Sequence, residues 1–461
     1  MAESQTNSGA DLHLVLSGTG LRAGLTDALR EAVRSGRLTP DTRLPASRTL
    51  AADLGVSRST VTESYAELVA EGWLTARQGS GTRVARRAEP QATAVLPRPT
   101  RPPRPIEALM PGAPDYAEFP RTAWLAAARR ALDAAPPSAF GYGDPLGRIE
   151  LRAALADYLA RARGVSADPR HIVICSGFHH GLALVARALR ARGARAVAVE
   201  AYGLDLYRTL LVDAGLDVGS IPVDEHGARV GELRDVAAVL LTPAHQFPTG
   251  VALSPERRAQ VLDWARTTGG LILEDDYDGE FRYDRKPVGA LAGLDPDRVV
   301  YFGTASKSLA PAIRAAWTVT PGHLLPEVAA AKGPVETVSV LDQLTLAEFI
   351  RSGAFDRHVR VRRQTYRRRR EQLIAALARA APEVRVTGMA AGLQAVLVLP
   401  PGTEKAALQA ASRRGLKISS LGEFHGGATP DALVVNYSAV SDSAWDGTLD
   451  ALVAALRPLS P

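Results

Sequence analysis

One lysine of this chain lies in a setting that suits amine chemistry. The 461 residues include 55 lysines and arginines, of which only five are lysines, at positions 286, 307, 332, 405 and 417. Because the chain otherwise uses arginine for positive charge, a lysine within a motif indicates an amine that can lose its proton and form an imine. Lys307 lies in TASKSLAPAIR, among small residues that would let a planar ring approach the amine closely.

Two other segments carry groups that would complement such a ring. Asp275 and Tyr277 follow the apolar run LILE, where a carboxylate is costly unless it faces a cation such as a protonated pyridine nitrogen. Gly177 and Phe178 follow the run HIVIC and open a helical pattern. Their amides therefore lie at a helix N-terminus, which is a natural place for a phosphate.

The segment around Lys307 also offers phosphate ligands. Thr304 and Ser306 supply hydroxyl groups, and Arg314 supplies a guanidinium group. Each feature alone has a common alternative, because loop lysines are usually solvated and adjacent aspartates after a strand often cap a turn. Together, a phosphate turn, a carboxylate with a tyrosine, and a lysine with an arginine favour a pyridoxal phosphate site.

These motifs need a scaffold that brings several strand ends together. Residues 108–461 alternate apolar runs typical of strands with amphipathic helical patterns. The runs are HIVIC, RAVAVE, AAVLL, LILE and VVYFG. This alternation predicts an α/β domain around a mostly parallel sheet, with ligands at the carboxyl ends of the strands.

The first part of the chain predicts a smaller domain at residues 12–85. Apolar residues at helical spacing over 21–33, 47–54 and 57–68 indicate three helices, with Ser47 and Ser57 as N-caps. The segment LGVS predicts a helix-turn-helix, and GWLTARQGSGTRVA predicts a β-hairpin wing. Hydroxyl and guanidinium groups in SRSTVTESY could reach DNA phosphates and base edges, although a protein-interaction module is the alternative.

The remaining composition limits the possible classes of protein. The proline-rich residues 86–107 predict a semi-rigid linker between the two domains. The net charge of +6 permits a polyanionic partner without requiring one.

The single cysteine, Cys175, excludes a disulfide framework and cysteine-based zinc sites, and we expect no metal. The sequence has no long apolar run and a polar start, so we expect a cytoplasmic protein with no membrane contact.

The smaller domain resembles the winged helix-turn-helix of GntR-type bacterial regulators across about fifty residues, from GRLTPDTRLPASR to GTRVA. The resemblance implies DNA contacts from the LPASR arginine, the start of the recognition helix and the wing glycines. Two further arginines would contact phosphates. The implied DNA-binding residues are Arg43, Arg48, Ser57, Arg58, Thr60, Arg77, Gly79 and Gly81.

The larger domain resembles fold-type I aminotransferases in YGDPLG, SGFHH, LTPAHQFPTG, LEDDYDGEFRY and YFGTASKSLAPAIR. The full chain resembles the MocR/GabR class of transcriptional regulators. The resemblance implies that Lys307 forms the Schiff base, Asp275 pairs with the pyridine nitrogen and Tyr277 hydrogen-bonds the ring hydroxyl. The implied phosphate ligands are Gly177, Phe178, Thr304, Ser306, Arg314 and, from the second subunit of a head-to-tail homodimer, Tyr142.

Three positions depart from the pattern of that class. Leu204 occupies the place of a tyrosine that stacks on the cofactor ring, so ring packing is predicted to be aliphatic. Leu206 and Val434 occupy the places of arginines that bind the carboxylate of an amino acid. A buried carboxylate without a guanidinium partner loses a bidentate ion pair and keeps its desolvation cost. We therefore expect weak binding of amino acids.

These features together predict a pyridoxal-phosphate-dependent regulator that binds a double-stranded DNA operator as a homodimer. Its aminotransferase-like domain would act as a sensor and not as an enzyme. The effector would be pyridoxal phosphate itself, as in the vitamin B6 regulators of the class, or an amine. The alternative is an active aminotransferase with an autoregulatory DNA-binding domain. The arginine-rich residues 357–372 are interpreted as a solvated helix face, and Cys175 as a core residue.

Overall fold

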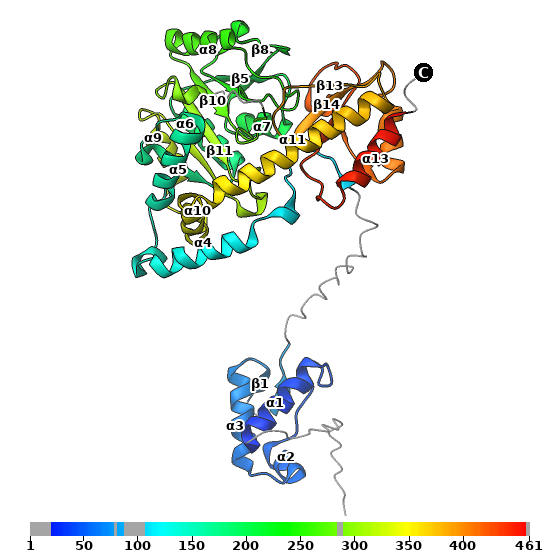
Figure 1. Cartoon of the computed structure of the whole chain (residues 1–461). Coiled ribbons are helices and arrows are strands. Elements are labelled where there is room, and N and C mark those ends of the chain that lie inside the picture. The colour runs from blue at the N-terminus through cyan, green and yellow to red at the C-terminus, as the bar shows by residue number, and fades with distance from the viewer. Residues whose placement is uncertain (1–19, 78–80, 87–106, 284–288, 458–461) are drawn as a thin grey trace, which may run out of the picture. The chain divides into compact units, whose positions relative to one another are not determined.

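A computed structural model describes residues 20–77, 81–86, 107–283 and 289–457. The chain divides into two compact units, residues 1–102 and 103–461 (Figure 1). Gly79 and nearly all of the expected linker lie outside the described residues. Among the described residues, no helix is long and apolar enough to cross a membrane.

The smaller unit is a three-helix domain with a two-stranded hairpin, as the sequence predicts. Its helices are α1 (Leu21–Arg34), α2 (Ser47–Leu54) and α3 (Arg58–Ala70). The strands β1 (Leu74–Arg77) and β2 (Gly81–Val84) pair antiparallel. Apolar side chains from all of these elements form one buried core.

Of the two predicted helix caps in this unit, one is confirmed and one is wrong. The Ser57 hydroxyl accepts a hydrogen bond of 3.1 Å from the Thr60 amide at the start of α3. In α2 the N-cap residue is Ala46, and it makes no side-chain cap. Ser47 is already the first helical residue, one position too late to cap.

Replacing Ser57 with alanine should weaken α3 locally. Loss of an N-cap hydrogen bond costs about 1 kcal/mol, which is a roughly fivefold increase in the open population. Hydrogen exchange measured by mass spectrometry on peptides of α1 to α3 would detect this change. Ser47→Ala is the matched control and should leave exchange unaltered. Equal effects of the two substitutions would contradict the cap assignment.

The larger unit is built on a seven-stranded sheet in the order β4-β12-β11-β10-β9-β5-β6. All its neighbouring pairs are parallel except those of β12, which is antiparallel to β11 and to β4. The sequence predicts five of these strands and misses β6 and β12. The strands are β4 (Ile172–Cys175), β5 (Ala196–Glu200), β6 (Asp217–Ile221), β9 (Ala238–Leu241), β10 (Leu271–Asp275), β11 (Val299–Thr304) and β12 (Ala316–Val319).

Helices cover both faces of this sheet. Ile172 and Ile174 of β4 belong to one core cluster, whereas Val173 and Cys175 belong to a second. The first cluster includes residues of α4, α5, α8 and α10, and the second includes residues of α6, α7 and α9. These helices are α4 (Arg121–Ala134), α5 (Ile149–Arg163), α6 (Phe178–Ala191), α7 (Asp205–Asp213), α8 (Pro255–Thr268), α9 (Leu325–Lys332) and α10 (Val340–Arg351). Cys175 is a core residue, as predicted, and burial raises the pKa of its thiol to about 12.

The C-terminal part of the larger unit has a second sheet, in the order β13-β14-β17-β16. In Figure 1 the long helix α11 runs from the main sheet to this part. Its elements are α11 (Ala354–Ala380), β13 (Arg385–Thr387), β14 (Gln394–Val398), α12 (Glu404–Arg413), β16 (Ser419–Ser420), β17 (Ala432–Asn436) and α13 (Trp445–Leu456). The larger unit also has two short strand pairs. One joins β3 (Glu107–Ala108) to β15 (Leu416–Lys417), and the other joins β7 (Val223–Asp224) to β8 (Gly227–Ala228).

The arginine-rich run of α11 is not simply a solvated face. Arg362 and Arg369 are buried, and the Arg369 guanidinium donates to the backbone oxygen of Tyr437 at 3.1 Å. The two arginines are seven residues apart, so they share the helix face that also carries the buried Tyr366 and Leu373. The prediction is therefore wrong for these two side chains.

Candidate cofactor site and DNA-binding unit

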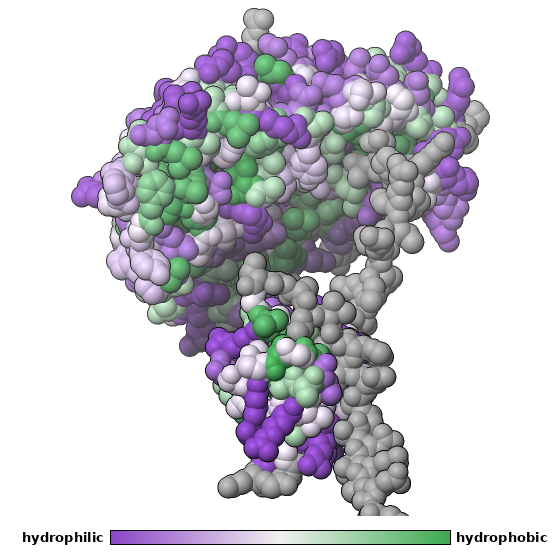
Figure 2. Space-filling view, turned by 90° about the horizontal axis from the view of Figure 1, so that it is seen from below, coloured by the Kyte–Doolittle hydropathy of each residue, from purple (hydrophilic) through white to green (hydrophobic). Residues whose placement is uncertain are grey.

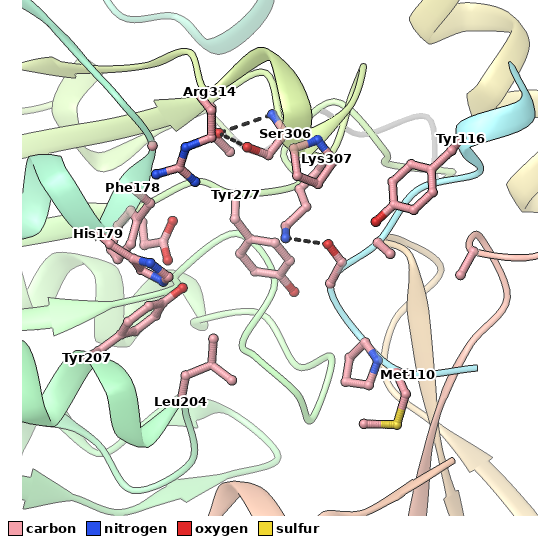
Figure 3. Close-up of a pocket in the computed structure, with 18 residues that line it drawn as sticks. Met110, Tyr116, Phe178, His179, Leu204, Tyr207, Tyr277, Ser306, Lys307 and Arg314 are labelled. Carbon is pink, nitrogen blue, oxygen red and sulfur yellow. Dashed lines mark hydrogen bonds between the residues drawn. The ribbon is translucent and has the colours of Figure 1, made fainter. Parts of the chain in front are cut away.

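A cavity of about 540 Å³ lies beyond the carboxyl ends of β4, β10 and β11 (Figure 3). These strands point the same way, which brings their following loops together. Nine of the predicted cofactor residues line this cavity: Gly177, Phe178, Leu204, Asp275, Tyr277, Thr304, Ser306, Lys307 and Arg314. Tyr142 does not line it and is fully exposed.

The end of the cavity where the sequence predicts a phosphate is formed where β4 passes into α6. Gly177 is the N-cap of α6 with φ +106°, and a Cβ atom there would lie 3.2 Å from the guanidinium nitrogens of Arg314. Glycine is therefore needed both for the backbone conformation and for the space. The Thr304 hydroxyl bonds the Ser306 hydroxyl at 2.9 Å and accepts from the Ser306 amide at 3.1 Å. Amides, hydroxyl groups and a guanidinium thus converge on one concave site.

Asp275 and Lys307 supply the charged groups at the centre of the cavity. Burial raises the pKa of Asp275 well above its usual range, and the nearby Lys307 opposes this rise. Burial lowers the pKa of Lys307, and Asp275 and Asp278 partly offset the effect. Figure 3 shows the Lys307 amine bonded to the backbone oxygen of Gly112, at 2.6 Å. An amine whose pKa is lowered, beside a carboxylate that needs a cation, fits the chemistry of a pyridoxal group.

The structure shows that the three carboxylates of the run DDYD have different partners, which the sequence alone does not reveal. Asp275 lines the cavity, whereas Asp276 accepts hydrogen bonds from Arg163 at 2.5 and 2.8 Å and from the Tyr301 hydroxyl at 2.7 Å. Asp278 contacts the ring of His245 at 2.8 Å. Only one of the three carboxylates is therefore available to a ligand in the cavity.

Three aromatic residues of the cavity, Tyr116, His179 and Tyr207, were missed by the sequence analysis. His179 and Tyr207 line it together with Leu204, and the Tyr207 ring lies 4.8 Å from that of Phe178 and 5.6 Å from that of His179. Aromatic side chains as well as Leu204 therefore line the cavity, and aliphatic packing on the ring stays a prediction. Tyr207 is on α7, three residues after Leu204, and this spacing was a signal that could have found it.

The two positions of the predicted arginine losses differ, because Val434 is buried among apolar residues whereas Leu206 is exposed. Val434 is buried on β17 in a cluster with Val396, Leu421 and Phe424, and Leu206 does not line the cavity. A second cavity of about 280 Å³ shares Lys307, Asp275 and Tyr277 with the first. Its described lining residues include no arginine; those not shared with the first cavity are Asp205, Phe247, Ser419, Glu423 and Phe424.

In the smaller unit, most of the predicted DNA-binding residues are exposed. A groove of about 650 Å³ between α3 and the hairpin is lined in part by Arg43 and Gly81. Gly81 has φ +82°, and a Cβ atom there would lie 3.2 Å from Nε of Arg43. Thr60 is half-buried and is bonded to Ser57. The exposed residues of the predicted set are Arg43, Arg48, Ser57, Arg58, Arg77 and Gly81.

Comparisons with known proteins identify both parts. The model of aminotransferase class I and II matches residues 109–452, and that of the bacterial regulatory proteins of the gntR family matches residues 21–84. Kynurenine aminotransferase of Pyrococcus horikoshii, solved with PMP, has a TM-score of 0.68 at 26% identity, covering 77% of this chain and 91% of that one. The fold is thus that of fold-type I aminotransferases, whose cofactor is pyridoxal phosphate.

Curated relatives share both parts in one chain. The pyridoxine biosynthesis transcriptional regulator PdxR of Corynebacterium glutamicum is 33% identical over 434 residues, covering 92% of this chain and 94% of that protein. The probable rhizopine catabolism regulatory protein MocR of Rhizobium meliloti is 32% identical over 464 residues, covering 94% and 93%. The chain belongs to the MocR-type family of transcriptional regulators, in which a GntR-type DNA-binding domain is joined to an aminotransferase class I and II domain.

Proposed function

We propose that the aminotransferase-like domain senses pyridoxal phosphate and does not work as an aminotransferase. The observation that carries this proposal is the gathering of nine predicted cofactor residues around one cavity, next to a second cavity whose described lining residues contain no arginine. An amino-acid carboxylate placed there would face the carboxylates of Asp205 and Glu423, and no guanidinium among the described lining residues would compensate its desolvation with a bidentate ion pair. The similarity to a pyridoxine biosynthesis regulator supports the cofactor as the signal.

The residues of the cavity would divide the work of holding the cofactor. Lys307 would bind its aldehyde carbon, Asp275 would keep a proton on its ring nitrogen, and Tyr277 would donate to its ring oxygen. When bound, pyridoxal phosphate supplies an electrophilic carbon and an electron-withdrawing ring. The phosphate would be held by the amides of Gly177 and Phe178 and by the side chains of Thr304, Ser306 and Arg314.

Homodimer formation is part of the same proposal. Tyr142 is fully exposed, so its phenol is free to reach a cavity outside its own subunit. Figure 2 shows hydrophobic residues among hydrophilic ones on one face of the larger unit. Large apolar side chains left exposed on α4 and in the segment after it would be covered in a dimer: Leu125, Leu132, Phe140, Tyr142 and Ile149.

Sensing requires that the cofactor favours one arrangement of the two DNA-binding domains of a dimer. Only an arrangement that matches the spacing of two half-sites binds the operator tightly. A ligand shifts such an equilibrium only by its difference in affinity between the two states. The cofactor cavity and the DNA-binding unit are therefore expected to be thermodynamically coupled.

The test is a gel-shift titration of the full chain against DNA from upstream of its own gene. Operator affinity should differ between protein freed of pyridoxal phosphate and protein saturated with it. Equal affinity in the two states would exclude sensing. Steady multiple turnover with any pair of amino acid and keto acid would instead establish an active aminotransferase.

Arg58 is expected to contribute directly to operator binding. It is exposed at the first position of α3, where side chains of a recognition helix reach base edges. Arg58→Ala should weaken operator binding about tenfold or more and relax specificity at the contacted base pair. Arg34→Ala, at the end of α1, is the matched control and should bind as the wild type does. Unchanged affinity for Arg58→Ala in a gel shift would argue against this docking mode.

A further inference from the structure

The hydroxyl group of Tyr277 is held by a buried network that the proposed cofactor roles do not use. It lies 3.0 Å from Nδ1 of His245 and 3.0 Å from Nε2 of Gln394. The same Nδ1 atom lies 2.8 Å from Oδ2 of Asp278. All four side chains are buried. They come from the end of β10, the turn at 245–250 and strand β14, so three separate segments meet at one phenol oxygen.

The partners of His245 determine where its proton lies. A carboxylate only accepts hydrogen bonds, so a bare Nδ1 atom would face an acceptor at 2.8 Å. The proton therefore lies on Nδ1, between Asp278 and the Tyr277 oxygen. Nε2 of His245 is buried without a hydrogen-bond partner among the described residues. Such a site tolerates a lone pair better than an N–H group, which agrees with the proton lying on Nδ1.

This arrangement also determines the direction of the Tyr277 proton. The phenol oxygen receives one hydrogen bond from His245 and a second from the Gln394 amide, whose nitrogen can only donate. Burial raises the pKa of Tyr277 well above its usual range, so its proton is retained. Asp278 also contacts this hydroxyl and adds to the rise in the pKa of Tyr277, but its carboxylate already accepts from Nδ1 of His245. With the oxygen occupied by two donors, the remaining O–H bond is therefore directed toward the cavity that Tyr277 lines.

The His245 ring has little freedom to leave this position. A Cβ atom on Gly392 would lie 2.1 Å from its Cε1 atom, and one on Gly250 would lie 3.2 Å from its Nε2 atom. Both glycines have φ near +74°, a conformation that other residues rarely adopt. The backbone therefore approaches the ring closely from two segments and fixes its orientation.

We propose that Asp278 and His245 are positioning residues for the cofactor: they hold the Tyr277 hydroxyl as a donor toward the ring oxygen of pyridoxal phosphate. This inference rests on the cofactor placement proposed above. A donor at the ring oxygen neutralises negative charge there and so weakens proton binding at the nearby nitrogen of Lys307. Asp275 and Asp278 also face Lys307, and His179 and Arg314 line the same cavity. Of these groups only Asp278 changes its charge in the variants below, and its negative charge favours a proton on Lys307.

The test is the pH dependence of the visible absorption of the protein with bound pyridoxal phosphate. Asp278→Asn removes the carboxylate that fixes the proton on Nδ1, so His245 is no longer held as a donor and its Nδ1 atom can instead accept from Tyr277. The Tyr277 proton would then point away from the cofactor. Loss of one hydrogen bond to a charged oxygen should raise the titration midpoint by about one pH unit.

A double-substitution cycle separates this route from a direct effect of charge. Tyr277→Phe alone should raise the midpoint, and adding Asp278→Asn to it should change nothing further, because the proton being positioned is already gone. If Asp278→Asn shifts the midpoint equally in both backgrounds, Asp278 acts by its charge and the proposal is overturned.

A second variant keeps the proposal testable if Asp278→Asn does not fold. His245→Leu removes the donor without changing a neighbouring charge and should raise the midpoint in the same direction. An unchanged midpoint in folded His245→Leu would overturn the proposal. Wild-type protein that shows no visible band with the cofactor would instead contradict the cofactor placement itself, so the two failures are distinguishable.

Discussion

Replacing Lys307 with alanine is expected to abolish covalent capture of pyridoxal phosphate. Lys307 is the only lysine among the described residues that line the two connected cavities. Burial lowers the pKa of its amine, which increases the fraction of free base able to attack an aldehyde. After borohydride reduction, the wild type should carry a mass adduct on the peptide containing Lys307, and the variant should carry none.

Two further variants test whether loss of the adduct is due to loss of the Lys307 amine itself. Lys307→Arg keeps a positive charge near Asp275 but cannot form the covalent bond, so it should also lack the adduct. Lys405→Ala, on α12, changes a lysine that lines neither cavity and should behave as the wild type. Operator affinity of Lys307→Ala should no longer depend on the cofactor. An adduct of normal yield in Lys307→Ala would show that another amine captures the aldehyde.

Much of the fold could be predicted because its signals are local. The run HIVIC forms β4 and the run LILE forms β10, since short apolar stretches between helical patterns are typical of buried strands. Their order also brings the phosphate turn at Gly177, the carboxylate of Asp275 and the amine of Lys307 to one cavity. That convergence follows from a rule of sheet geometry and needs no knowledge of side-chain contacts.

The parts that could not be predicted depend on contacts between distant residues. Nothing in the run DDYD tells which carboxylate faces the cavity; the answer depends on Arg163, more than a hundred positions away, which engages Asp276. The His245 network likewise involves Gln394, 117 residues after Tyr277. The buried Arg369 looks like any solvated arginine until its backbone acceptors in the C-terminal part are known.

The pair of Arg163 and Asp276 is expected to be a major source of stability of the larger unit. Arg163 ends α5 and donates two hydrogen bonds to Asp276 and one to the backbone oxygen of Gly279 at 3.2 Å. The two side chains are 4% and 1% exposed. Arg163→Met would leave a buried carboxylate with only the Tyr301 hydroxyl as a donor. Removal of one partner of a buried ion pair costs about 3–5 kcal/mol.

Urea unfolding of the full chain would measure this loss, with Arg170→Met as the control. Arg170 pairs with Asp168 at 2.6 Å on the surface, where solvent screens the interaction, so its loss should be close to neutral. A similar urea midpoint for the two variants would contradict the claim that the Arg163–Asp276 pair is a major source of stability.

Because Asp276 lies between Asp275 and Tyr277, Arg163→Met should also weaken binding of pyridoxal phosphate in the fraction that remains folded. Adding Asp276→Leu to Arg163→Met should restore part of the stability, since no unpaired charge then remains buried.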